Sequence, residues 1–180
     1  MSSTWRKFLE KGFWIAIVTF IIAYLLTKPE SLYGYFGCIG EAIGIALILM
    51  GVYEQWLWLY SPFEKIPKIK GKYMGYIEYS YNGTFDKKEA TINIKQSLLS
   101  TRVKIITDEI TSNTITSNIV HENGEYVLYY TYITNPKSKY SNDNPIQYGT
   151  CRVTSNVKSE LQGTYWTTRK TIGDIYLKKV

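Results

Sequence analysis

A strand-like segment near the end of the chain carries residue types that bind phosphorylated ring compounds. Every second side chain of an extended strand shares one face, and here that face carries Gly163, Tyr165, Thr167, Arg169 and Thr171. Beyond Gly173 the face continues with Ile175 and Leu177, and we take this aliphatic end to mark the interior of the fold. A guanidinium binds phosphate through two parallel hydrogen bonds, and a tyrosine ring stacks on a nucleobase. The face therefore predicts a polar chamber for an anionic ligand that contains rings.

Other segments add aromatic and cationic side chains to this predicted chamber. Tyr130 and Tyr132 share one face of their segment. Tyr148 and Arg152 share a face with Ile146, whose aliphatic side chain again suggests the interior. The predicted ligand contacts, with arginines for phosphates and tyrosines for bases, are Arg169, Arg152, Tyr76, Tyr130, Tyr132, Tyr148, Tyr165 and Thr167.

Arg169 also has a purely structural interpretation. In small lipid-binding barrels an early aromatic residue between glycines is often covered by a basic residue of a late strand, and Gly71-Lys72-Tyr73-Met74-Gly75 is such a segment. Arg169 would then cover Tyr73 at the floor of a barrel. Each polar group in such an interior needs a partner, which a ligand or a neighbouring ring can supply, so the sequence leaves both interpretations open.

Catalytic and metal-binding patterns are not found in the sequence. It has no G-x-S-x-G, no H-E-x-x-H, no Cys/His pair and no Gly-rich phosphate loop. Asp108-Glu109 is an adjacent acidic pair at a strand end, where we expect solvated side chains. The cysteines Cys38 and Cys151 and the single His121 suggest neither a disulfide nor a metal site, and they favour a reducing compartment. We expect a protein that is not an enzyme and that has no cofactor.

The second part of the chain predicts an all-β domain. Short segments rich in Tyr, Thr, Ile and Val alternate with turn signals such as Asn82-Gly83 and Asn123-Gly124. The predicted strands are Lys72–Ser80, Thr91–Leu98, Arg102–Asp108, Asn113–Val120, Tyr126–Thr134, Ile146–Ser155, Gln162–Thr171 and Gly173–Lys178. An eight-stranded antiparallel barrel of the lipocalin-like type is favoured over an open sheet, because closure leaves no exposed edge.

Two apolar segments precede this domain. The run from Tyr35 to Tyr53 holds 19 residues with Glu41 as its only charge, and at a rise of 1.5 Å per residue it approaches the roughly 30 Å of a bilayer's hydrocarbon core. A shorter apolar run extends from Gly12 to Leu26, and a break at Thr27–Ser31 predicts a hairpin of two transmembrane helices. More basic residues flank the hairpin than lie in its loop, so both termini are expected in the cytoplasm.

One face of the second apolar helix is nearly bare backbone. It carries the predicted membrane-assembly residues Gly37, Gly40, Glu41, Gly44 and Gly51. Glycine faces let helices approach closely, and a carboxylate in a membrane faces protein or water because lipid cannot solvate it. Two interpretations follow for Glu41: a protonated side chain that only bonds to a neighbouring helix, or a carboxylate that lines a pore or interface when several copies assemble.

Charge is distributed unevenly over the predicted domains, which are a helical hairpin over residues 1–61, a linker over 62–70 and a β-barrel over 71–180. The net charge of +6 resides entirely after Ser61, which suits an anionic partner. Solvated surface positions are expected for Lys87, Lys88, Lys178 and Lys179.

Several motifs together resemble a known family. They are Lys-Ile-Pro-x-Ile-x-Gly-x-Tyr-x-Gly (Lys65 to Gly75), Tyr-Tyr-Thr-Tyr-x-x-x-Pro (Tyr129 to Pro136), Asn-Pro-Ile-x-Tyr-Gly-Thr (Asn144 to Thr150) and Gly-x-Tyr-Trp-Thr-x-Arg-x-Thr-x-Gly (Gly163 to Gly173). With the two preceding helices, this order resembles the two-transmembrane β-barrel effectors of bacterial CBASS antiphage systems, which are associated with CD-NTase enzymes.

The resemblance implies a cytoplasmic barrel that binds a cyclic di- or oligonucleotide made by a partner CD-NTase after phage infection. Binding would then drive homo-oligomerisation of the hairpins among the membrane lipids, disrupt the bacterial inner membrane and kill the cell. No nucleic acid polymer is expected as a partner. The alternatives are a membrane-tethered carrier of lipids or other apolar ligands, and a purely structural membrane subunit.

Overall fold

The computed structural model describes residues 3–81, 83–142, 144–155 and 160–180. It divides into two compact units, which we describe separately. The first comprises residues 1–64 with 97–99, and the second comprises residues 65–96 with 100–180.

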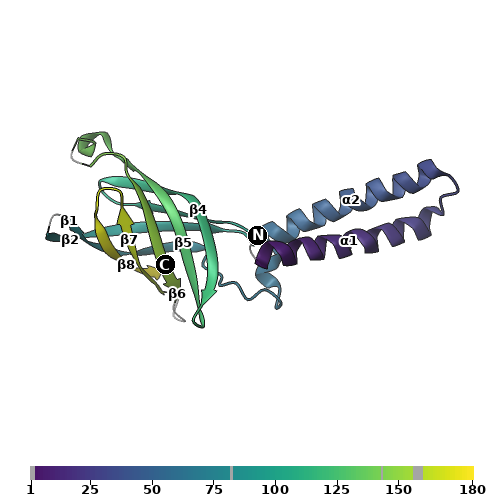
Figure 1. Cartoon of the computed structure of the whole chain (residues 1–180), viewed down its shortest axis with the longest axis horizontal. Coiled ribbons are helices and arrows are strands. Elements are labelled where there is room, and N and C mark those ends of the chain that lie inside the picture. Colours follow the sequence, from purple (N-terminus) through teal and green to yellow (C-terminus); the bar gives the residue numbers. More distant parts are fainter. Residues whose placement is uncertain (1–2, 82, 143, 156–159) are drawn as a thin grey trace. The chain divides into compact units, whose positions relative to one another are not determined.

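The first unit contains a hairpin of two long helices, α1 (Ser3–Thr27) and α2 (Leu32–Gln55), followed by the short 3-10 helix η1 (Leu57–Tyr60) (Figure 1). Both long helices are apolar and long enough to cross a membrane. The Ser31 side chain accepts a hydrogen bond of 3.2 Å from the backbone N–H of Gly34 and so caps the start of α2. The predicted helical hairpin is therefore confirmed.

Small side chains bring α1 and α2 together. The face of α2 that carries Cys38, Ala42, Ala46 and Met50 is buried, with the spacing of four residues that one helix face requires. On α1, Thr19 Oγ1 donates a hydrogen bond of 3.2 Å to the carbonyl oxygen of Ala42. This small-residue face is thus the one that holds the hairpin together.

The second unit is a closed barrel in which each strand pairs antiparallel with the next and β1 pairs with β8 (Figure 1). The strands are β1 (Gly71–Tyr81), β2 (Thr84–Gln96), β3 (Thr101–Ile106), β4 (Ile110–Glu122), β5 (Glu125–Pro136), β6 (Tyr148–Ser155), β7 (Glu160–Thr167) and β8 (Ile172–Lys179). A short 3-10 helix, η2 (Ser138–Tyr140), lies between β5 and β6. The predicted eight-stranded antiparallel barrel is confirmed.

Two strand boundaries differ from the prediction in ways that affect the interior. β2 begins at Thr84 rather than Thr91, because its charged first half pairs along β1 up to the partners Tyr81 and Thr84. β7 ends at Thr167, so Arg169 and Thr171 lie in the turn before β8, where Lys170 has a φ of 63°. The predicted turn at Asn123-Gly124 is present, with φ angles of 49° and 86°; Asn82 of the other predicted turn lies outside the described residues.

The core fills one end of the barrel. Along β1 the inward residues run from Tyr73, which is buried in the core, to Ile77 and Tyr79, which line a cavity. Along β5 they run from Leu128 in the core to Thr134 at the cavity. Aliphatic and aromatic side chains therefore fill one end of the barrel, and the other end contains a cavity.

Two glycines permit close contacts between neighbouring strands. A Cβ at Gly75 would overlap the carbonyl oxygen of Tyr176 on β8, and one at Gly163 would overlap the carbonyl oxygen of Arg152 on β6. Backbone atoms are the obstacle at both positions, so a side-chain rotation cannot relieve the overlap. These glycines allow the twisted strands to pack where any other residue would separate them.

Replacing Gly75 with Val should therefore open the junction between β1 and β8. We expect the variant to lose about 3 kcal/mol or more of stability, because overpacking against backbone cannot relax locally. Thermal unfolding followed by circular dichroism measures the loss. Met74→Val is the matched control, since Met74 is the neighbouring residue on β1 and is 51% exposed; equal melting temperatures for the two variants would contradict the assignment.

Buried hydroxyl and thiol groups lie in the middle of the barrel. Burial, and then the neighbouring Cys151, raise the pKa of Tyr130 well above its usual range, and the same two causes raise the pKa of Tyr132. Burial also raises the pKa of the Cys151 thiol to about 12. All three groups are therefore protonated at neutral pH, and the folded state holds these protons more tightly than the unfolded chain does.

The pH dependence of stability follows from these tyrosines. The stability that Tyr130 and Tyr132 contribute to the free energy of unfolding is fully present below the ordinary tyrosine pKa of 10.0. It is lost as the pH rises above this value towards the pKa of the folded state. We expect the melting temperature to fall steeply above pH 10, and to fall less steeply in Tyr132→Phe. Tyr148→Phe serves as the exposed control, and a melting temperature that stays constant to pH 11 would refute the expectation.

Candidate functional site

A cavity of about 550 Å³ occupies the open end of the barrel interior. This volume lies within the range of small-molecule sites, about 300 to 1,000 Å³. Part of its wall is aliphatic and consists of Ile77, Ile105, Ile110 and Ile175. Another part is aromatic and consists of Tyr79, Tyr132, Tyr140 and Tyr165. Flat rings and polar groups thus face a space large enough for a ligand.

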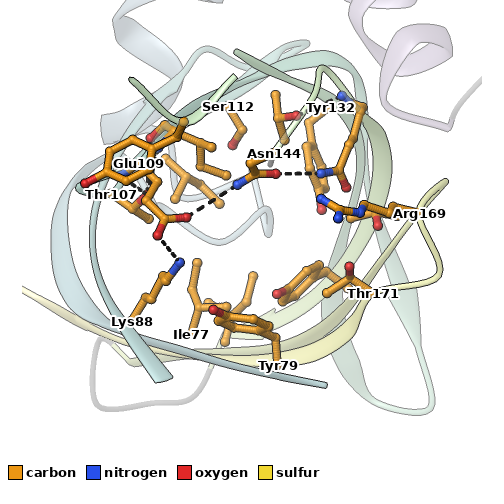
Figure 2. A pocket seen from close by; sticks show the side chains of 18 residues that line it. Ile77, Tyr79, Lys88, Thr107, Glu109, Ser112, Tyr132, Asn144, Arg169 and Thr171 are labelled. Atoms are coloured by element: carbon orange, nitrogen blue, oxygen red, sulfur yellow. Dashed lines mark hydrogen bonds and ion pairs between the residues drawn. The ribbon is translucent and has the colours of Figure 1, made fainter. Parts of the chain in front are cut away.

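Arg169 reaches the cavity from the turn between β7 and β8. The backbone N–H of Thr167 donates to the carbonyl oxygen of Thr171 at 3.0 Å, and that of Lys170 donates to the carbonyl oxygen of Thr167 at 3.0 Å. These bonds close the turn around Arg169. Figure 2 shows its guanidinium beside Tyr132 and Thr171. The turn thus presents a permanent cation to the cavity.

The hydroxyl group of Thr167 also belongs to the cavity wall. Within the part of the chain that the structure describes, its Oγ1 atom is buried and has no hydrogen-bond partner. A buried hydroxyl without a partner carries a free-energy penalty. A ligand that fills the cavity could remove this penalty by bonding to Thr167.

A chain of polar contacts crosses the cavity, beginning at Lys88 and Glu109, which lie opposite Arg169 (Figure 2). Lys88 Nζ is 2.6 Å from Glu109 Oε1. The other carboxylate oxygen of Glu109 accepts a hydrogen bond of 3.5 Å from Asn144 Nδ2, and Gln147 Nε2 donates to Asn144 Oδ1 at 2.7 Å. The chain joins β2, the turn between β3 and β4, and the segment that follows η2.

The charge states in the cavity follow from these contacts. Burial by itself would lower the pKa of Lys88, but the bonds to Glu109 and Tyr79 outweigh it, so the pKa lies above its usual value and Lys88 is cationic. Burial raises the pKa of Tyr165, so its phenol is protonated. Among the described residues that line it, the cavity therefore offers the cations of Lys88 and Arg169, the carboxylate of Glu109 and neutral hydroxyl groups.

Four of the eight predicted ligand contacts lie in the cavity wall: Arg169, Tyr132, Tyr165 and Thr167. A fifth, Tyr130, faces the interior but is packed in the core at 3% exposure. The structure thus brings together the residues predicted from the closing motif and from β5.

The other three predicted contacts, Arg152, Tyr148 and Tyr76, lie on the outer wall. Arg152 Nε donates to Tyr129 Oη at 3.1 Å, and Tyr148 is 55% exposed. The assumption that Ile146 marks the interior is wrong, because Ile146 is 59% exposed and the buried, inward residues of β6 are Cys151 and Val153. This corrects the predicted face by one position.

Tyr76 also faces outwards. Its ring lies 5.1 Å from that of Tyr176, centroid to centroid, and Lys87 Nζ lies 3.4 Å from its ring centroid. The inward residues of β1 are the odd-numbered ones, among them Tyr73, Ile77 and Tyr79. The strand alternation therefore places Tyr76 on the other side of the wall from the cavity.

Lys88 and Glu109 were expected on the solvated surface, and this expectation is wrong because both line the cavity. For Lys88 a signal exists in the sequence: it continues the alternation of the buried residues Ala90, Ile92 and Ile94 towards the start of β2. Glu109 lies in a turn, where strand alternation does not apply. Only the folded chain could place it.

The basic residue that lies over Tyr73 is Lys179 rather than Arg169. Tyr73 donates a hydrogen bond of 2.8 Å to the carbonyl oxygen of Ile69, and Lys179 Nζ lies 5.9 Å from its ring centroid. Lys179 thus supplies the basic residue of a late strand, and Arg169 lines the cavity.

The predicted membrane-assembly residues lie away from the small-residue face of α2. A Cβ at Gly37, Gly40, Gly44 or Gly51 would meet no other part of the described chain within 4 Å. Glu41 is exposed, and the described residues provide no hydrogen-bond or ion-pair partner for it. This second face of α2 is therefore unpacked in the single chain.

Comparison with known proteins agrees with this architecture. Residues 64–179 match the family described as Cap15, cyclic dinucleotide receptor domain. The CD-NTase-associated protein 15 of Staphylococcus schleiferi is 36% identical over 170 residues, which cover 93% of this chain and 92% of that relative.

The match covers both the helical hairpin and the barrel, so it confirms the family that the motifs predicted. It also agrees with a ligand, rather than a cofactor, as the occupant of the barrel. The chain therefore belongs to the Cap15 family of CBASS effectors, and residues 64–179 form its cyclic dinucleotide receptor domain.

Proposed function

We propose that the barrel cavity binds a cyclic dinucleotide made by a partner CD-NTase, and that binding leads the helical hairpins to assemble and disrupt the bacterial inner membrane. The observation that supports the first step best is the cavity itself, which combines a fixed arginine, a buried hydroxyl without a partner in the described chain, and tyrosine rings. Phosphate, ribose hydroxyls and bases are the groups that these side chains complement.

The competing function is transport of a lipid or another apolar ligand. Four isoleucines in the cavity wall support it, but an apolar occupant would make no favourable polar contact with Arg169 or with the Lys88–Glu109 pair, which line the same cavity. Native mass spectrometry of the full chain released from detergent separates the two functions. A nucleotide-sized anionic adduct supports the sensor, and a fatty-acid adduct supports the carrier.

Replacing Arg169 with Ala should abolish cyclic dinucleotide binding without unfolding the barrel. Loss of a bidentate contact to a charged group corresponds to a decrease in affinity on the order of 100-fold. Isothermal titration of the full chain in detergent with cyclic dinucleotides measures it. Arg152→Ala is the matched control on the outer wall, and an unchanged affinity of Arg169→Ala would refute the assignment.

The second step is assigned to the unpacked face of α2. We infer that both long helices cross the membrane with the termini in the cytoplasm, as the flanking basic residues predict. An unpartnered carboxylate in hydrocarbon costs about 2.5 to 3.5 kcal/mol on insertion scales. A neighbouring copy would give Glu41 a polar environment and would use the glycines for close backbone contact. Ligand binding need only favour the assembled state over the single chain.

Glu41→Gln and Gly44→Leu should therefore separate binding from membrane damage. Both variants should bind cyclic dinucleotide as the wild type does, because they lie outside the barrel, but they should fail to release dye from liposomes when the ligand is added. Ile43→Leu, an exposed apolar position of α2, is the control that should release dye. Full dye release by both Glu41→Gln and Gly44→Leu would remove this face from the mechanism.

A further inference from the structure

Two ion pairs of the same composition lie on opposite sides of the barrel wall. On the outside, Lys87 of β2 is 3.2 Å from Glu78 of β1. On the inside, Lys88 is 2.6 Å from Glu109, and both side chains are largely covered, at 25% and 22% exposure. A pair on the outer wall needs little compensation. The inner pair withdraws two charges from water, and apolar residues at these positions would stabilise the barrel at least as well.

The inner pair also conflicts with an anionic ligand. Among the described residues that line the cavity, those charged at neutral pH are Lys88, Arg169 and Glu109. A cyclic dinucleotide carries two phosphodiester charges. Arg169 lines the cavity across from Lys88 and is placed to contact one of them, whereas the carboxylate bound to Lys88 would repel the other.

We propose that Lys88 binds the second phosphate of the ligand and that Glu109 masks it until the ligand arrives. This inference rests on the proposed cyclic dinucleotide function. In the complex the phosphate replaces the carboxylate on Lys88 Nζ, so the two cations on opposite sides of the cavity each neutralise one phosphate. A ligand with a single phosphodiester can use Arg169 alone and does not compensate for breaking the Lys88–Glu109 pair.

The surroundings of Glu109 suit such a displacement. Its carbonyl oxygen accepts a hydrogen bond of 2.8 Å from the backbone N–H of Lys137, so the main chain is held in place. Its side chain leaves Lys88 by rotating about its own bonds, and Asn144 Nδ2, at 3.5 Å, is a second donor already beside it. Lys88 is held by the strand pairing of β2 with β1, opposite Ile77.

The test compares Glu109→Gln and Lys88→Gln with two outer-wall controls, Glu78→Gln and Lys87→Gln. The controls change the net charge of the protein by the same amount. The full chain in detergent is titrated calorimetrically with cyclic di-AMP, cyclic di-GMP, cyclic GMP–AMP and cyclic UMP–AMP, and the tightest wild-type ligand is used for all variants. Thermal unfolding of each variant verifies that it is folded. If Lys88→Gln is not folded, the charge-conserving variant Lys88→Arg replaces it.

We expect Glu109→Gln to bind about three- to tenfold more tightly, because a competing charge is removed, and Lys88→Gln to bind about tenfold more weakly. The outer-wall controls and Lys88→Arg should stay close to the wild type. Weaker binding by Glu109→Gln would overturn the masking role, and unchanged binding by Lys88→Gln would overturn the phosphate contact. Failure of the proposed function is a different result, in which the wild type binds none of the four ligands or Arg169→Ala binds as well as the wild type.

Discussion

Pairing of β1 with β8 closes the sheet, and the interior of this protein depends on that closure. In a closed barrel every second side chain of each strand must point into one shared space. At one end this space is filled by residues such as Tyr73, Ile92 and Leu177. At the other end the same alternation places Lys88 and Tyr79 inside, where they cannot pack as a dry core. The cavity is therefore a consequence of strand register together with the polar residues at that end.

The polar groups of this end are only partly satisfied by one another. Lys88, Glu109, Asn144 and Gln147 form a continuous chain of contacts, while Thr167 Oγ1 has no partner in the described part of the molecule. A barrel selected for stability alone would be better served by apolar side chains of similar size. The arrangement is understandable if a charged ligand completes it, which agrees with the receptor family to which the domain belongs.

The helical hairpin shows a comparable division between two faces of α2. The face with Cys38, Ala42 and Met50 is buried in the hairpin. The glycine face and Glu41 make no such contacts in the described chain. A single helix thus carries one face that packs within the hairpin and a second face that stays unpacked in the described chain.

The sequence by itself determined the helical hairpin, the eight strands and the family, because these depend on local patterns: apolar runs of membrane length, alternation of period two, turn residues and contiguous motifs. It also predicted Tyr132, Tyr165 and Thr167, which strand alternation turns towards the cavity, and Arg169, which reaches the same cavity from the turn after β7. Arg152 and Tyr148 were misplaced, because an aliphatic residue at a strand end, Ile146, is no guide to the interior when that end is exposed.

Only the tertiary structure decided which charged side chains line the cavity. The charged start of β2 has the composition of a loop, and it becomes a strand because β1 provides its hydrogen-bonding partners. That pairing brings Lys88 inside the barrel. Glu109 joins it from a turn, through an ion pair between residues far apart in the sequence. No local pattern encodes such a contact, since it exists only after the sheet has closed.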